Sequence, residues 1–171
     1  GVLNRELSKL LKEDIVVIGA SRTDSGVHSY GNVAVFDTNA RMPAEKISYA
    51  LNQRLPDDIV VQNSSEIPLD WHPRHCNSRK TYEYRILNRE FPMPQRRLDT
   101  WFVYRKLNIP AMCEAAEQFE GTHDFKSFCS VNTAVEDTTR TIYSCELKQD
   151  GELLTIRITG SGFLYNMVRI I

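Results

Sequence analysis

Two β-rich runs on either side of an Asp-Gly pair place the strongest constraint on how this chain can fold. The runs are Arg140 to Lys148 and Glu152 to Thr159, and Gln149-Asp150-Gly151 separates them. Asp-Gly between strand-forming segments is a strong β-hairpin signal, because both residues tolerate the positive φ that tight hairpin turns require. The sequence therefore predicts that these runs pair as neighbouring antiparallel strands.

A polar, glycine-bounded segment near the amino terminus is the first candidate functional loop. It runs from Gly19 to His28, between the apolar runs Ile15 to Ile18 and Val33 to Phe36. Those flanks are typical of strands, so the segment between them is predicted to be a loop at the edge of a sheet. The loop presents Asp24. Arg22, two residues earlier in an extended segment, would face the same way and keep the carboxylate ionised, as a nucleophile requires.

The same loop also has an ordinary structural interpretation. Asp-Ser-Gly is common turn chemistry, in which the aspartate side chain bonds to the backbone two residues further on. The segment by itself leaves both interpretations open.

Hydrophobic periodicity divides the rest of the chain into helices and strands. The predicted helices contain Leu3 to Leu11, Ile47 to Leu55, Asn108 to Phe119, and Gly162 to Ile171, the last of them apolar on nearly every side and so predicted to be buried. The further predicted strands are Ile59 to Val61 and Arg79 to Leu87, while Gly121 to Cys129 is predicted to be a structural loop.

The order of these elements predicts a two-part α+β fold. Each half supplies five of the six elements of the β-α-β-β-α-β pattern. We therefore expect two ferredoxin-like halves, residues 1–70 and 71–171, with antiparallel sheets, helices packed on one side, and an active-site cleft between them. The first half lacks the leading strand and the second lacks the closing strand, so we expect the sequence to be a piece of a longer protein.

Charge is unevenly distributed along the chain. The net charge is −1, but the segment from Arg74 to Lys106 holds nine basic and three acidic residues, a balance of +6 that leaves −7 for the rest. Such a segment is expected at a phosphate-backbone contact, and a solvated charged face would look similar. The four cysteines form no Cys-x-x-Cys pair, which fits free thiols in a reducing cytoplasm and suggests no metal site. No apolar run approaches the roughly 20 residues of a membrane span.

Arg169 and Tyr82 are the other candidate functional residues. A guanidinium in a buried helix needs a carboxylate partner, and Asp24 is the obvious candidate, although a lone arginine more commonly reaches water from an exposed helix end. Tyr82 lies in the predicted strand beside the basic segment. It could pack against a neighbouring strand or serve as a planar platform for a base.

Four segments, in this order, resemble the motifs of the tRNA pseudouridine synthase A family. They are Gly19 to His28, Arg79 to Tyr84, Gly121 to Phe125, and Phe163 to Arg169.

The resemblance implies a cytoplasmic homodimer that isomerises uridines in the anticodon stem-loop of tRNA to pseudouridine, without metal or cofactor. It also implies that Asp24 is the nucleophile, that Tyr82 contacts the base, and that Arg22 and Arg169 are active-site arginines. The main alternative is a noncatalytic RNA-binding module of two RRM-like units, which would stack bases on exposed aromatic residues. A remoter one is an aspartyl phosphotransferase, which would need a magnesium site.

Overall fold

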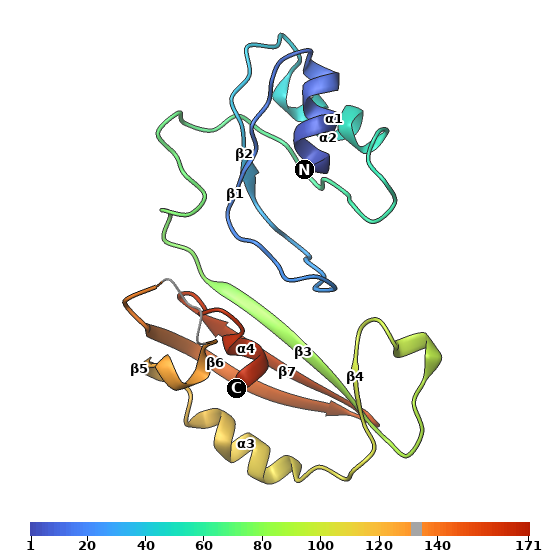
Figure 1. Ribbon diagram of the computed structural model, residues 1–171, viewed down its shortest axis with the longest axis vertical. Helices are drawn as coiled ribbons and strands as arrows, with labels where there is room; N and C mark the ends of the chain where they lie inside the picture. Colours follow the sequence, from blue (N-terminus) through green and yellow to red (C-terminus); the bar gives the residue numbers. More distant parts are fainter. Residues whose placement is uncertain (131–134) are drawn as a thin grey trace. The chain divides into compact units, whose positions relative to one another are not determined.

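A computed structural model describes residues 1–130 and 135–171, and they form two compact units. Unit 1 is Gly1–Asn77 and unit 2 is Ser78–Ile171. Figure 1 labels the elements of both. None of the helices in the described ranges is long and apolar enough to span a bilayer.

Two helices build the core of unit 1. They are α1 (Val2–Leu11) and α2 (Ala44–Asn52), and both were predicted from their apolar spacing. Their leucines and isoleucines meet in a cluster of buried side chains: Leu7, Leu11, Ile15, Ile47 and Leu51. Because Ile15 belongs to this cluster, the chain that leads from α1 towards the Asp24 loop is held by the core.

The sheet of unit 1 is shorter than the sequence suggests. Its strands, β1 (Ile18–Gly19) and β2 (Ala34–Val35), pair antiparallel with Ile18 opposite Val35. The apolar runs on either side of the loop therefore do pair, but only over two residues each. A two-stranded ribbon has little ladder of its own to keep longer strands regular.

The predicted strand Ile59 to Val61 is wrong. Those residues belong to no strand, and the Asn52 side chain makes the hydrogen bonds to Val61 that a neighbouring strand would have made. The Asn52 amide accepts from the Val61 N–H (2.8 Å) and donates to the Val61 carbonyl (2.9 Å), so the backbone groups that a ladder would have satisfied are already paired.

Unit 2 is built on a five-stranded sheet in the order β4-β3-β7-β6-β5. In chain order the strands are β3 (Lys80–Asn88), β4 (Trp101–Val103), β5 (Gly121–Asp124), β6 (Thr139–Asp150) and β7 (Leu153–Gly160). The hairpin of β6 and β7 is confirmed, and Gly151 in its turn has φ +57°. Two expectations are corrected. The segment predicted as a loop from Gly121 contains β5 and a 3₁₀ turn (Lys126–Phe128), and β4 runs parallel to β3.

The parallel pairing of β3 and β4 is possible because the segment that connects them is long. Antiparallel neighbours can be joined by a tight turn, whereas parallel neighbours need a crossover of about a dozen residues or more. The chain between Asn88 and Trp101 provides such a length, and it contains the 3₁₀ turn Pro94–Arg96. The basic, proline-containing stretch thus serves as the crossover that returns the chain to the same edge of the sheet.

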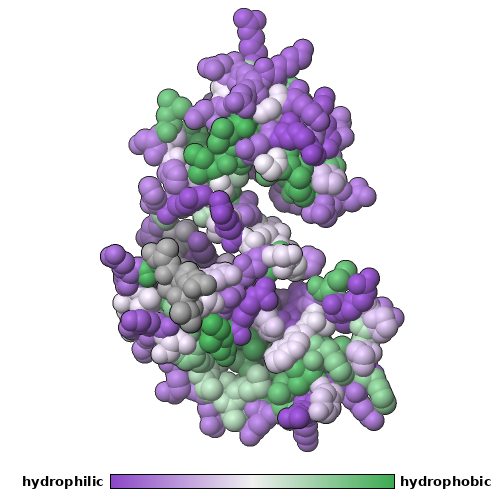
Figure 2. Space-filling view, in the orientation of Figure 1, coloured by the Kyte–Doolittle hydropathy of each residue, from purple (hydrophilic) through white to green (hydrophobic). Residues whose placement is uncertain are grey.

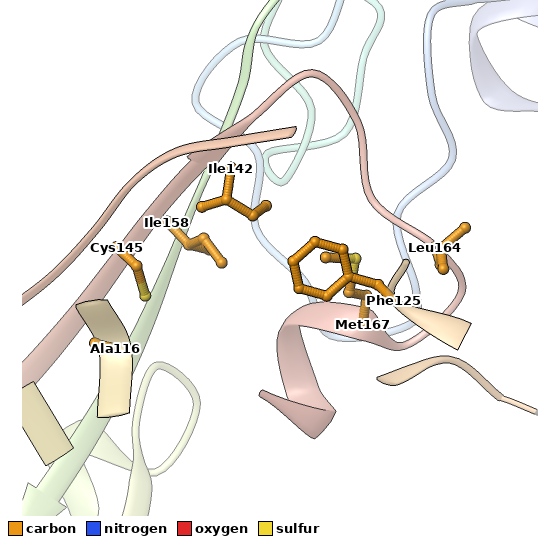
Figure 3. Close-up of a cluster of buried hydrophobic side chains, with 7 residues drawn as sticks. All are labelled: Ala116, Phe125, Ile142, Cys145, Ile158, Leu164 and Met167. Carbon is orange, nitrogen blue, oxygen red and sulfur yellow. The ribbon is translucent and has the colours of Figure 1, made fainter. Parts of the chain in front are cut away.

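Two helices cover one face of this sheet (Figure 1). They are α3 (Ile109–Glu117), which Asn108 caps by accepting from the Ala111 N–H, and α4 (Met167–Ile170). Both contribute to a buried cluster, shown in Figure 3: Ala116, Phe125, Ile142, Cys145, Ile158, Leu164 and Met167. In Figure 2 hydrophobic side chains gather on the visible surface of unit 2 in the region of α3.

A β-bulge in β6 shapes this core. Ile142 and Cys145 are three residues apart, and strict alternation would place them on opposite faces of the sheet. The register shifts between Ile142 and Ser144, so Tyr143 is the extra residue and both Ile142 and Cys145 enter the same cluster. The mixed α+β class is confirmed, while the ferredoxin-like organisation of the halves stays a prediction.

The prediction of one buried helix from Gly162 to Ile171 is wrong. Only Met167–Ile170 is helical, and an irregular segment leads into it. Leu164 and Met167 are buried, which accounts for the apolar character of the sequence. Leu164 lies in the irregular segment and Met167 begins α4, and the Met167 N–H donates to the Leu164 carbonyl (3.1 Å), so a turn ahead of the helix brings both side chains into the core.

Candidate active site

The base of the Asp24 loop is held closed by hydrogen bonds between its two arms. Beyond the β1–β2 pair, the Ala20 N–H donates to the Val33 carbonyl (2.8 Å). The Asn32 side-chain amide then donates to the Ser21 carbonyl (3.1 Å). These bonds extend the pairing of β1 and β2 towards the tip of the loop.

The tip of the loop is a turn closed by the main chain. The Val27 N–H donates to the Asp24 carbonyl (3.1 Å), and Gly26 has φ +79°. A positive φ at the third residue of a turn is the requirement of a type II turn, and glycine meets it without strain. The turn interpretation of Asp-Ser-Gly is therefore correct, but a main-chain bond closes the turn. The side chains of Arg22 and Asp24 are both exposed, as a catalytic role requires.

A side chain from a distant part of unit 1 also contacts the base of this loop. Arg74 Nε donates to the carbonyl of Gly19, the last residue of β1, at 2.9 Å. Sequence reasoning counted Arg74 only as part of a basic segment. The two residues are 55 positions apart, and no local pattern indicates that they meet.

Tyr82 lies on β3, opposite Ile158 of β7, and is half-buried. Its ring meets the ring of Phe163 edge to face, with centroids 5.1 Å apart and an angle of 84° between the planes. Phe163 and Tyr82 both pack against the buried cluster of unit 2. The structure thus supports the packing interpretation of Tyr82, and the contact also fixes the direction of the ring, which a base platform would need.

Arg169 is exposed, and the expectation of a guanidinium inside a buried helix is wrong. A helix turns by about 100° per residue, so Arg169 lies about 200° round α4 from Met167, whose side chain is 0% exposed. Met167 therefore points into the core of unit 2, and Arg169 lies on the opposite, exposed side of α4. Asp24 and Arg22 belong to unit 1, Tyr82 and Arg169 belong to unit 2, and the pairing of Asp24 with Arg169 stays a prediction.

The histidine-containing segment at β5 makes local contacts. The His123 ring nitrogen Nε2 lies 2.7 Å from the Glu120 carbonyl, and the Lys126 N–H donates to Asp124. The Thr138 hydroxyl also donates to Asp124, and these bonds to the ionised form lower the pKa of its carboxyl, that of Thr138 having the larger effect. Across residues 1–130 and 135–171, no group of three or more potential metal ligands occurs.

Comparison with known proteins adds to this geometry. A family model described as tRNA pseudouridine synthase matches residues 1–75 and 115–171. Relatives named tRNA pseudouridine synthase A share much of the sequence. The one from Thermoanaerobacter sp. (strain X514) is 45% identical over 170 residues, which are 99% of this chain and 70% of the relative. The one from Anoxybacillus flavithermus is 46% identical, covering 100% and 70%. The chain belongs to the tRNA pseudouridine synthase family.

Proposed function

We propose that this chain isomerises uridine in tRNA to pseudouridine and that Asp24 is the nucleophile. The observation that carries the proposal is the exposed Asp24 side chain at the tip of a main-chain-closed turn, in a chain of the tRNA pseudouridine synthase family. A loop with a fixed base and an exposed acid can present a carboxylate to a nucleotide without unfolding. The same loop carries Arg22.

The reaction exchanges one bond to the ribose for another. The bond between C1′ and the ring nitrogen N1 breaks, the uracil turns, and C1′ bonds to C5. The C5 hydrogen leaves as a proton, and N1 gains one. An ionised carboxylate can take part by attacking either C1′ of the ribose or C6 of the base, since each gives a covalent intermediate that holds one partner while the ring reorients.

The other candidate residues have roles that fit this chemistry. We assign Arg22 and Arg169 to balancing the negative charge of the freed uracil. Tyr82, with its ring fixed by Phe163, is assigned to contact the base. The target uridine has to leave its stack to reach any of these groups, which is usual for enzymes that act on a base.

The finer substrate and assembly belong to the same proposal. We infer that the target uridines lie in the anticodon stem-loop, and that the enzyme is a cytoplasmic homodimer that uses no cofactor. The positive segment from Arg74 to Lys106 supports an RNA substrate, because phosphate contacts supply much of the affinity for nucleic acids.

The test is Asp24→Asn in the full-length protein. Turnover is measured as tritium release from tRNA labelled with [5-³H]uridine, because the C5 hydrogen is lost in the reaction. We expect tRNA affinity to stay within about threefold and turnover to fall about ten-thousandfold or more, as for the loss of other covalent nucleophiles. Asp57→Asn, which removes an exposed carboxylate elsewhere in unit 1, is the matched control and should leave both unchanged.

A noncatalytic RNA-binding module predicts a different result. The unmodified protein would then bind tRNA and release no tritium, and Asp24→Asn would behave like it. That outcome would refute the proposal.

A further inference from the structure

Arg74 differs from several other cations of the basic segment, because no carboxylate of the described residues pairs with it. Arg85 is paired with Glu83 (2.7 Å) and Asp99 (3.4 Å). Similarly, Arg96 pairs with Asp99 and Arg89 pairs with Glu152. These ion pairs neutralise three of the nine basic residues of the segment, Arg85, Arg89 and Arg96.

The side chain of Arg74 is held by a neutral group instead. Its Nε–H donates to the Gly19 carbonyl, which uses one of the five N–H donors of the guanidinium. The side chain is exposed and makes no other hydrogen bond or ion pair within residues 1–130 and 135–171. The two terminal nitrogens therefore keep their four donors and the full positive charge, on a side chain whose direction is already fixed.

The turn that carries Arg74 presents further donors. The Arg74 backbone N–H donates to His72 Nδ1 (3.2 Å), so a neutral His72 ring has its proton on Nε2. The His75 N–H donates to the His72 carbonyl, and the two imidazole rings lie 4.3 Å apart. The turn thus carries two neighbouring imidazoles as well as the guanidinium that contacts Gly19.

The position of this turn relates it to the Asp24 loop. Gly19, which Arg74 contacts, is five residues before Asp24, and a fully extended chain of that length spans about 18 Å at most. This distance corresponds to a few nucleotides of an RNA strand. A guanidinium fork is the side-chain group best matched to the two free oxygens of a phosphodiester.

We propose that Arg74, with the imidazoles of His72 and His75, binds a backbone phosphate of the tRNA strand close to the target uridine. This inference rests on the proposed function for the identity of the RNA. The anchor on Gly19 lowers the entropy lost when the phosphate binds, because the side chain is ordered beforehand. The same anchor places a fixed positive charge beside the loop that presents Asp24.

The experiment compares Arg74→Ala with Arg54→Ala in the full-length protein. Arg54 is an exposed arginine of unit 1 with no side-chain partner among the described residues, so its replacement removes the same charge elsewhere. The Kd for tRNA is measured at several salt concentrations, together with kcat and KM from tritium release and the urea midpoint of each variant.

We expect Arg74→Ala to raise Kd and KM by roughly 10- to 100-fold with little change in kcat, the range for loss of a charge-assisted hydrogen bond. The slope of log K against log salt should become less negative by about 0.7 to 0.9, the value for one phosphate contact. Arg74→Lys keeps the charge and should retain the slope with an intermediate Kd. Arg54→Ala should match the unmodified protein.

Two results would overturn the inference. An Arg74→Ala protein with lower kcat, a lower urea midpoint and an unchanged salt slope would show that Arg74 only supports the loop. Equal slope changes in Arg74→Ala and Arg54→Ala would show an effect of net charge alone. Failure of the proposed function is distinct, since it appears as absence of tritium release from the unmodified protein whatever Arg74 does to binding.

Discussion

Replacing Gly160 with alanine tests how tightly the end of the β6–β7 hairpin is packed. Gly160 is the last residue of β7 and is buried between its partners in β3 and β6. An added Cβ would lie 2.9 Å from the Thr141 carbonyl oxygen, 3.0 Å from Ile142 Cδ1 and 3.3 Å from Phe163 Cζ. The backbone of Gly160 is not in the positive-φ region, so alanine meets no dihedral penalty and the obstacle is steric alone.

The size of the effect follows from which atoms must move. The nearest atom is a main-chain oxygen of β6, which cannot rotate away, so the two strands have to separate locally. Overpacking of this kind costs about 1–3 kcal/mol. Alanine also lowers the conformational entropy of the unfolded chain, which stabilises the folded state by about 0.4–1 kcal/mol. We therefore expect Gly160→Ala to lower the free energy of unfolding by roughly 0 to 2.6 kcal/mol, with a central value of about 1.3 kcal/mol.

The matched control is Gly162→Ala, two residues further along the chain. Its Cβ would lie 3.7 Å and 3.8 Å from atoms of the Arg140 side chain, which are ordinary contacts, and its φ is not positive either. This variant should gain about 0.4–1 kcal/mol from the unfolded state. Urea unfolding with equal m-values measures the difference between the two variants.

A Gly160→Ala protein as stable as Gly162→Ala would refute the steric argument. The substitution also pushes on Phe163, whose ring contacts Tyr82. If Tyr82 contacts the base as proposed, turnover should fall in Gly160→Ala under conditions where the protein remains folded.

Two further predictions concern titratable groups of unit 2. In the folded chain the pKa of Asp124 is lowered below its ordinary 3.8, first by the Thr138 hydroxyl and then by the Lys126 N–H. The ionised carboxylate therefore stabilises the fold above about pH 4, and this stabilisation is lost as the pH falls through the folded pKa. Asp124→Asn should therefore lower the urea midpoint at neutral pH. The gap between the urea midpoints of the variant and the unmodified protein should shrink as the pH falls below about 4, and a gap that does not change with pH would contradict this. Burial raises the pKa of the Cys145 thiol to about 11. In the folded protein at pH 8, Cys145 should therefore react with iodoacetamide far more slowly than the other three cysteines, Cys76, Cys113 and Cys129. Mass spectrometry of the labelled peptides measures the four rates, and equal rates would contradict the prediction.

The sequence predicts best those elements whose cause is local. The β6–β7 hairpin depends on Gly151 in the two-residue turn between two strand-forming runs, and α1 and α2 depend on leucines and isoleucines at helical spacing. The strand prediction for Ile59 to Val61 was wrong because three apolar residues cannot show that the Asn52 side chain satisfies the backbone of Val61. The helix predicted over Gly162 to Ile171 was wrong over its first half because Leu164 is buried from an irregular segment, without helical backbone.

The sequence predicts which residues form the candidate site, but it predicts their contacts and exposure only in part. The loop, its turn and its acid can be read from Gly19 to His28, because turn chemistry is local. The contact of Arg74 with Gly19 joins residues 55 positions apart and has no signature in either segment. The exposure of Arg169 was mispredicted because apolar neighbours on both sides were taken to mean that the arginine was buried as well.

Each candidate functional side chain of this chain depends on a neighbour that is itself firmly held. Arg169 follows Met167, which is fully buried in α4, and Tyr82 is positioned by Phe163. In unit 1 the exposed Asp24 sits on a loop that hydrogen bonds hold at its base, one of them from Arg74 to Gly19. Chemistry on an everted nucleotide needs exposed groups in fixed positions. Substitutions that disturb Met167 or Phe163 should therefore alter turnover even though neither residue need touch the base, and the comparison of Gly160→Ala with Gly162→Ala measures this for Tyr82.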